Sequence, residues 1–294
     1  MKIPAFILTL LSSLLLSFCR GIFYFPDSRT FFTPEKAGFK KEEIFFPAYN
    51  GVKLHAWYIP SRKGKAKGTI IQFHGNAENM STHFINLLWM SDAGYDLYTF
   101  DYRGYGKSEG KPNRKLIYKD SILITNYVNE LSKKNKLKLI IYGQSLGSII
   151  ALRVIPEIKD KENIAAVVAE GAFASYRDIA RSKIRNVCFP PMDSILAFIF
   201  FPDSYSAKKS VPEVAPALLI AMHGRRDPVI PIQFGKDIYI MANKPKVFIE
   251  TSNGGHMNWN HPRMQEHKKT FTDLLDKAIS GKVSDQTEDV LTFE

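Results

Sequence analysis

The sequence predicts an α/β protein built on a mostly parallel, twisted sheet with helices on both faces. Six apolar runs have the length and the residue types of buried strands: 69–73, 97–100, 139–142, 165–169, 217–222 and 246–250. Helical patterns lie between or after these runs, at 80–91, 116–131, 148–155, 232–241 and 264–279. Continuous apolar strands that alternate with helices are typical of a parallel sheet buried on both faces.

An antiparallel N-terminal hairpin is predicted at one edge of this sheet. Residues 43–47 and 52–60 have the composition of strands, and they flank Tyr49-Asn50-Gly51. An Asn-Gly pair between two such runs is a strong signal for a hairpin turn. We therefore expect the hairpin to add antiparallel strands to the parallel ones.

Composition limits the possible partners. The chain has 294 residues, 45% of them hydrophobic, and a formal net charge of +11. This basic balance fits either an anionic partner or a lysine-rich solvated surface. The lysines are scattered and no nucleic-acid motif is present, so we predict no nucleic-acid partner. The two cysteines exclude a disulfide framework and a multi-cysteine zinc site.

The motif GQSLG at 143–147 is the strongest indication of chemistry. It follows the apolar run 139–142 and precedes the helical pattern at 148–155. Strand, Gly-x-Ser-x-Gly and helix together form a nucleophile elbow, so Ser145 is the predicted nucleophile. The Leu146 amide would then lie at a helix N-terminus, where it can bind a developing oxyanion.

A second match to the same pattern, GKSEG at 106–110, is predicted to lie in a loop. It follows the polar run 101–105 and is followed by Lys111-Pro112-Asn113, so no helix is expected to begin there. Ser108 is therefore not the predicted nucleophile.

A serine nucleophile needs a base, and the base needs a group that orients it. Asp227 follows the run 217–222, and His256 follows the run 246–250. Both therefore lie in loops at the same carboxyl edge of the sheet as Ser145. We predict that Asp227 orients His256 and that His256 accepts the serine proton.

Several residues compete for these roles. Glu170 ends the run 165–169 and is an alternative acid, and His261 is the nearest alternative base. His74 and His223 also follow strands, but each precedes a glycine and is better interpreted as shaping its loop. A metal site formed by His74, His223 and His256 is conceivable, but their spacing does not favour it, and we predict no metal.

The second oxyanion donor should come from the loop after the run 69–73. The Asn76 amide is the first candidate and the Ala77 amide the second. The alternative is that His74-Gly75-Asn76 forms an ordinary turn.

Five motifs together resemble a known superfamily: FHGNA (73–77), DYRGYGKS (101–108), GQSLG (143–147), HGRRD (223–227) and GH (255–256). On these motifs the chain resembles the α/β-hydrolase superfamily from about residue 25 to residue 279. It is most similar to the Bem46-like and ABHD13/ABHD17-like group of serine hydrolases. The resemblance implies an α/β-hydrolase fold, and it assigns Ser108 to the Asp-x-Arg-Gly-x-Gly-x-Ser loop.

These inferences predict a serine hydrolase that cleaves small carboxylic esters or thioesters through an acyl-enzyme, as a monomer and without a cofactor. A peptidase or amidase of the same fold is one alternative. A non-catalytic, membrane-tethered binding protein is another.

The domain is predicted to span residues 25–280, and the polar, acidic tail at 281–294 is predicted to be unstructured. The longest interval between strands, 172–214, contains many apolar residues. It could be a lid that lines an acyl pocket, a surface that meets a membrane, or a segment packed against the sheet. Cys188, within it, is expected to be a small buried apolar residue.

Residues 1–19 are predicted to be a leader or an N-terminal membrane anchor. Lys2 precedes an almost unbroken apolar stretch at 3–18. Residues 16–19 resemble a bacterial lipoprotein processing box, which makes Cys19 a candidate for lipidation, although Phe18 stands where a small residue is usual. A lipoprotein, an uncleaved anchor and a secreted protein remain open, and we expect a membrane-associated protein of the cell envelope.

Overall fold

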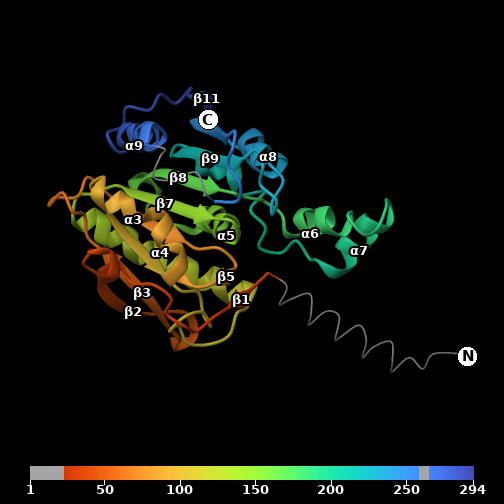
Figure 1. The fold of residues 1–294 in the computed structure, drawn as a ribbon, viewed down its shortest axis with the longest axis horizontal. Helices are drawn as coiled ribbons and strands as arrows, with labels where there is room; N and C mark the ends of the chain where they lie inside the picture. Colours follow the sequence, from red (N-terminus) through yellow and green to blue (C-terminus); the bar gives the residue numbers. More distant parts are fainter. Residues whose placement is uncertain (1–22, 258–264) are drawn as a thin grey trace, which may run out of the picture.

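The computed structural model describes residues 23–257 and 265–294, which are arranged around a nine-stranded sheet (Figure 1). The strands follow the spatial order β11-β10-β9-β8-β7-β4-β6-β3-β2. Their bounds are β2 Glu42–Pro47, β3 Lys53–Ile59, β4 Gly68–Phe73, β6 Tyr95–Phe100, β7 Leu139–Gln144, β8 Ile164–Glu170, β9 Leu218–Gly224, β10 Lys246–Thr251 and β11 Glu288–Phe293.

The predicted fold class is confirmed. All neighbouring strands from β11 to β6 pair in parallel, whereas β3 is antiparallel to both β6 and β2. The turn between β2 and β3 places Asn50 and Gly51 at φ of 62° and 75°, the left-handed region that an Asn-Gly pair tolerates. A separate two-stranded parallel ladder joins β1 (Phe25–Pro26) to β5 (Ala77–Glu78).

Helices cover both faces of the sheet. Their bounds are α2 Met80–His83, α3 Ile85–Asp92, α4 Arg114–Lys134, α5 Leu146–Val154, α6 Tyr176–Ile184, α7 Met192–Phe200, α8 Gln233–Met241 and α9 Gln265–Ile279. Short 3₁₀ helices occupy Pro34–Ala37, Tyr49–Gly51, Ile155–Glu157, Lys161–Asn163 and Val211–Val214.

The core consists of two layers because successive strand residues point to opposite faces. Ile71 and Ile141 pack in one cluster with side chains of α4, α5 and α8. Ile70 and Ile140, one residue earlier in the same strands, pack in the other cluster with side chains of α3 and α9. This double burial explains why the strands have continuous apolar sequences.

The prediction of an unstructured tail is wrong. Strand β11 pairs in parallel with β10 along its whole length, from Lys246↔Glu288 to Thr251↔Phe293. Glu288 forms ion pairs with Lys244 (2.7 Å) and Lys246 (3.1 Å), and Phe293 stacks on His267 with ring centroids 4.5 Å apart. The polar composition predicted disorder, but the edge of β10 offers backbone groups that this segment can bond.

The interval 172–214 contains the pair of helices α6 and α7, which pack on each other and extend away from the sheet (Figure 1). This arrangement excludes the possibility that the whole segment packs against the sheet. Cys188, in the loop between the two helices, is half-buried rather than buried. The predicted leader 1–19 and Cys19 lie outside the described residues. Within 23–257 and 265–294, no helix combines the length and the apolar character that crossing a bilayer requires.

Replacing Phe293 with alanine is expected to lower the free energy of unfolding by about 3 kcal/mol, because its ring is 4% exposed and leaves a cavity when removed. Urea denaturation would measure this change. Val290→Ala is the matched control, since Val290 lies in the same strand but is 63% exposed; its effect should stay within about 0.5 kcal/mol. Equal, small effects of both substitutions would contradict an ordered β11.

Candidate active site

Ser145 occupies a sharp turn between β7 and α5. Its backbone has φ 52° and ψ −116°, a strained conformation that costs roughly 1–3 kcal/mol. The flanking glycines are required by close backbone contacts. A Cβ on Gly143 would lie 2.5 Å from Ser148 Cα, and a Cβ on Gly147 would lie 2.0 Å from the Phe73 carbonyl oxygen. The turn therefore forms only with glycine at both positions.

Asp227 and His256 lie together at the carboxyl edge of the sheet. His256 Nδ1 is 2.7 Å from Asp227 Oδ2, and the Asp227 carboxylate is fully buried. The other oxygen, Oδ1, accepts the backbone amides of Val229 (2.8 Å) and Ile230 (2.9 Å). His223 Nε2 approaches Oδ2 to 3.4 Å and also lies 2.8 Å from the Ile230 carbonyl oxygen. Both carboxylate oxygens are therefore occupied.

This environment keeps Asp227 ionised. Burial raises the pKa of Asp227, but the contacts with His223, with His256 and with the Ile230 amide together outweigh burial, so the pKa lies below its ordinary value. An ionised carboxylate at Nδ1 favours the tautomer of His256 that carries its proton there. The other ring nitrogen, Nε2, is then free to accept a proton.

The end of β8 connects His256 with the serine turn. The Glu170 carbonyl oxygen accepts the Ser145 amide at 2.9 Å. The next residue, Gly171, has φ 55° and packs against the imidazole, since a Cβ there would lie 3.1 Å from His256 Cε1. One short stretch of backbone thus contacts both residues.

Glu170, the alternative acid, points to a different group of residues. Its Oε2 accepts hydrogen bonds from Tyr142 Oη (2.9 Å) and Gln144 Nε2 (2.8 Å), and burial raises its pKa. These partners belong to β7, so the Glu170 carboxylate contributes to the packing between β7 and β8. The alternative base, His261, lies outside the described residues.

Asn76, in the loop after β4, lines the same cavity as Ser145 and Leu146. His74 Nδ1 lies 2.8 Å from the Gly75 carbonyl oxygen, and an oxygen can only accept, so Nδ1 carries the proton. Burial lowers the pKa of His74 well below its usual value, which keeps the ring neutral. In a trans peptide the N–H points away from the C=O. The bond from His74 to Gly75 therefore directs the Asn76 N–H away from the His74 ring.

The residues after β6 brace this loop. Tyr102 Oη donates to the His74 carbonyl oxygen (2.9 Å), and Tyr105 Oη donates to the Asn76 carbonyl oxygen (2.8 Å). Both tyrosines are buried. They fix the 74–75 and 76–77 peptides, which flank the peptide that carries the Asn76 N–H.

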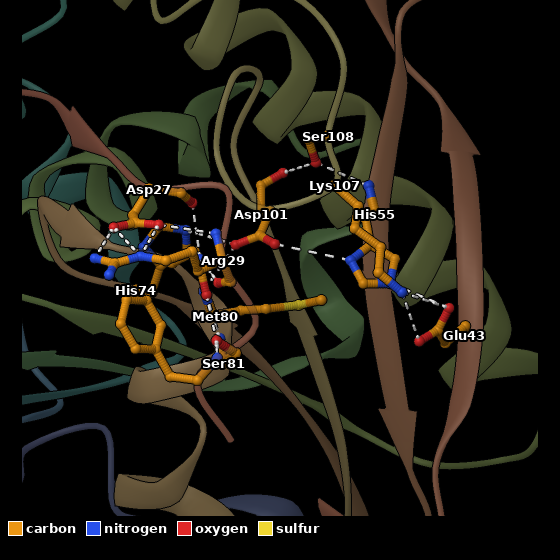
Figure 2. Close-up of polar contacts among 12 residues, drawn as sticks. Asp27, Arg29, Glu43, His55, His74, Met80, Ser81, Asp101, Lys107 and Ser108 are labelled. Carbon is orange, nitrogen blue, oxygen red and sulfur yellow. Dashed lines mark hydrogen bonds and ion pairs between the residues drawn. The ribbon is translucent and has the colours of Figure 1, made fainter. Parts of the chain in front are cut away.

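Ser108 belongs to the same brace. Its Oγ donates to the Asp101 carbonyl oxygen (2.7 Å) and accepts the His55 amide (2.8 Å), as Figure 2 shows. The Asp101 carboxylate in turn accepts the Met80 amide at 2.7 Å and lies 3.6 Å from His74 Nε2. As expected from the sequence, no helix begins at Ser108, and its hydroxyl bonds to backbone.

A cavity of about 380 Å³ opens beside Ser145. Its lining is almost entirely apolar, and Lys183 is the one charged side chain among the described residues that line it. The lining residues are Phe23, Asn76, Ser145, Leu146, Phe173, Ile179, Ala180, Lys183, Ile184, Val187, Phe201, Val229 and Ile230. Helix α6 therefore forms one wall of the cavity, in agreement with the prediction that part of 172–214 lines a pocket.

The contact between His223 and Asp227 was missed by the sequence analysis, which assigned His223 only to loop shaping. Its place at the end of β9, four residues before Asp227, was the available signal. The role of Gly171 was missed as well. Its position directly after a strand-ending glutamate gave no indication of the imidazole that packs on it.

Comparisons with known proteins identify the family and the fold. The family described as serine aminopeptidase, S33, matches residues 64–198. A structure of a Pyrococcus furiosus esterase superimposes with a TM-score of 0.67 at 20% identity, covering 87% of this chain and 98% of that one. At this level of identity the superposition shows the fold alone.

Relatives are found in bacteria and eukaryotes. Lysophosphatidylserine lipase ABHD12 from Gallus gallus is 30% identical over 63% of this chain and 50% of its own length. Protein bem46 from Schizosaccharomyces pombe is 26% identical over 68% of this chain and 64% of its own length. The uncharacterized protein YfhR from Escherichia coli O157:H7 is 35% identical over 241 residues, which are 81% of this chain and 80% of YfhR. Such identity along most of both chains means that the protein belongs to the YfhR family, within the α/β-hydrolase superfamily.

Proposed function

We propose that this protein is a serine hydrolase that cleaves carboxylic esters or thioesters of apolar acyl groups. The observation that carries the proposal is the contact of His256 with the buried Asp227 carboxylate, with Nδ1 and Oδ2 at 2.7 Å, beside the strained turn of Ser145. Strain at a turn that exposes a serine to a cavity is typical of a nucleophile rather than of a structural residue.

The reaction would proceed through an acyl-enzyme. His256 Nε2 removes the proton of the Ser145 hydroxyl as Oγ attacks the acyl carbon. The amides of Leu146 and Asn76 stabilise the oxyanion of the tetrahedral intermediate. The intermediate collapses as His256 returns the proton to the departing alcohol or thiol. A water molecule, deprotonated by the same imidazole, then releases the acid and restores Ser145.

The lining of the cavity supports an acyl substrate. Phe173, Ile179, Ile184 and Ile230 provide apolar surface for a hydrocarbon chain. An aminopeptidase would need a carboxylate for the ammonium group of its substrate, and among the described residues that line the cavity there is none. The name of the relative ABHD12, a lysophosphatidylserine lipase, also favours ester chemistry.

The leader remains a proposal of its own. We infer from residues 3–18 and from Cys19 that the protein is held at a membrane of the cell envelope. Mass spectrometry of the N-terminal peptide separates a lipidated Cys19 from an uncleaved or a simply secreted form. The closer placement beside ABHD13 and ABHD17 proteins also remains a prediction.

A fluorophosphonate probe is expected to label the protein at Ser145, because the probe reacts with serines activated by a neighbouring base. Ser145→Ala should abolish labelling, and Ser108→Ala is the matched control because Ser108 lies in the second Gly-x-Ser-x-Gly match. Labelling detected by gel fluorescence that persists in Ser145→Ala would refute the assignment.

Asp227→Asn is expected to lower kcat for a p-nitrophenyl ester by roughly 10³–10⁴-fold, because the amide no longer fixes the tautomer of His256. Glu170→Gln should retain most of the turnover, since Glu170 bonds to Tyr142 and Gln144. If Glu170→Gln is the more damaging change, the acid has been misassigned.

The lowered pKa of Asp227 also makes the stability of the wild type depend on pH. The contribution of the Asp227 carboxylate to the free energy of unfolding is complete above the ordinary pKa of a free aspartate, about 3.9. It is lost as the pH falls below that value.

His74 is predicted to act as a positioning residue for the Asn76 amide. His74→Phe removes the bond to the Gly75 oxygen (2.8 Å) and should lower kcat by about 10²–10³-fold, the value of one oxyanion donor, with little change in KM. His74→Asn should restore much of kcat, because its amide nitrogen can occupy the place of Nδ1. A loss that appears in KM, or that asparagine does not reduce, would argue for a packing role instead.

A further inference from the structure

The outer side of α7 and of the loop before it forms an apolar surface, which we call the α7 face. It consists of large apolar side chains that are between 47% and 82% exposed: Val187, Phe189, Met192, Ile195, Phe198 and Ile199. Isolated exposed apolar residues are normal, but a contiguous group of this kind marks a surface that meets another apolar phase. The pair α6–α7 extends away from the body, so the α7 face is accessible (Figure 1).

Helix α7 is anchored to α6 through the side that is opposite the α7 face. The Asp193 carboxylate is fully buried and lies 3.2 Å from Arg181 Nε and 3.4 Å from Arg185 Nε. Ala197, one turn later, is also buried. The packing of α7 on α6 therefore fixes which side of α7 is exposed, and that side is the apolar one.

The α7 face is continuous with the mouth of the cavity. Val187 belongs to the face and lines the cavity as well. Val229, on the other side of the mouth, is 44% exposed and also lines the cavity. Ile184 and Ile179 of α6 continue the apolar lining toward Ser145. Lys183 is the one charged side chain among the described residues that line the cavity, so most of the path from the face to the serine is apolar.

The apolar N-terminal stretch joins the domain at the same place. Phe23, the first described residue, packs against Tyr176 (5.1 Å between ring centroids) and Phe201 (6.1 Å) at the base of α6–α7. In sequence the stretch 3–18 ends five residues before Phe23. Phe23 also lines the same cavity as Val187, so in sequence the apolar stretch lies five residues from the wall of this cavity.

Basic side chains of α6 lie next to α7. Arg177 lies over the ring of Phe198 in the α7 face, with its guanidinium carbon 4.7 Å from the centroid. Arg181 and Arg185 pair with Asp193 on the opposite side of α7, and their side chains are 45% and 58% exposed. Cations around an apolar patch match the phosphates and acyl region of an anionic bilayer.

We propose that the α7 face docks into the interfacial layer of an anionic membrane, so that the cavity opens toward lipid. The ester cleaved at Ser145 would then belong to a membrane lipid with a hydrocarbon chain, such as a lysophospholipid, that enters past Val187 and Val229. The docking depends on the surface alone. The substrate class rests on the proposed function.

Docking can be tested without catalysis. The full chain, with Cys19→Ser and Cys188→Ser, carries a single nitrobenzoxadiazole label at Phe198→Cys and is reconstituted into vesicles of phosphatidylcholine and phosphatidylglycerol. The label should emit at shorter wavelength and be quenched by doxyl groups on the lipid chains, and less so in pure phosphatidylcholine. Ile240→Cys on α8 is the matched control: Ile240 is 69% exposed but remote in sequence from α7, and a label there should stay in water.

The same experiment distinguishes the other possible occupants of the α7 face. A label at residue 198 that is shielded from water but not quenched by the lipids would mean that protein covers the face, and the proposal would be wrong. Oxidation of the unlabelled Phe198→Cys protein would then identify a second copy by a disulfide between two thiols at residue 198. Without such a disulfide, the chain's own N-terminal segment would be the protein that covers the face. A label fully exposed to water would equally overturn docking.

An activity measurement tests the substrate class. Phe198→Asp combined with Ile199→Asp should reduce hydrolysis of a lysophospholipid in anionic vesicles by about tenfold or more, since two apolar anchors are lost. Turnover of a short, soluble p-nitrophenyl ester should stay within about twofold, as should both activities in Ile240→Asp. Lipid quenching of the label without any ester turnover would refute the proposed function and leave docking intact. Turnover of the soluble ester by a protein whose label stays in water would refute docking and leave the proposed function intact.

Discussion

The close contact between α5 and the sheet is the constraint on which the site depends. Gly147 lies so near the Phe73 carbonyl that no side chain fits, and Gly143 is equally close to Ser148. Because α5 can approach β4 and β7 to this distance, the turn between β7 and α5 is sharp and Ser145 lies at its apex. The same approach brings the loop after β4, which carries Asn76, next to the first turn of α5. The positions of Ser145, the proposed nucleophile, and of both amides proposed for the oxyanion thus depend on the absence of a side chain at Gly143 and Gly147.

The Asp227 carboxylate holds the other half of the site together. It receives two amides from its own loop, one imidazole from the end of its strand and one from the loop after β10. Such a buried charge is stable only when each oxygen has partners, because an unpaired buried charge is costly. The partners therefore also fix the positions of the loops after β9 and β10. The two halves meet at Gly171, whose small size lets the imidazole lie against the end of β8.

Much of this arrangement could be predicted because short stretches of neighbouring residues determine it. Continuous apolar strands, an Asn-Gly turn and a strand-glycine-helix junction each depend on a few neighbouring residues. The tail and His223 could not be predicted in the same way. Strand β11 is ordered because β10 offers an open edge, a property of the assembled sheet. The contact between His223 and Asp227 likewise depends on how the loop after β9 folds back.

The pair α6–α7 enters and leaves the sheet through a narrow neck. Ser175 Oγ lies 2.8 Å from Asp203 Oδ1, and the Ala207 amide donates to the Ala174 carbonyl oxygen at 2.8 Å. These bonds close the segment at its base, so strands β8 and β9 keep the same register whatever lies beyond the neck. A change in length or sequence beyond the neck would therefore alter the wall of the cavity and leave the sheet and the turn of Ser145 in place.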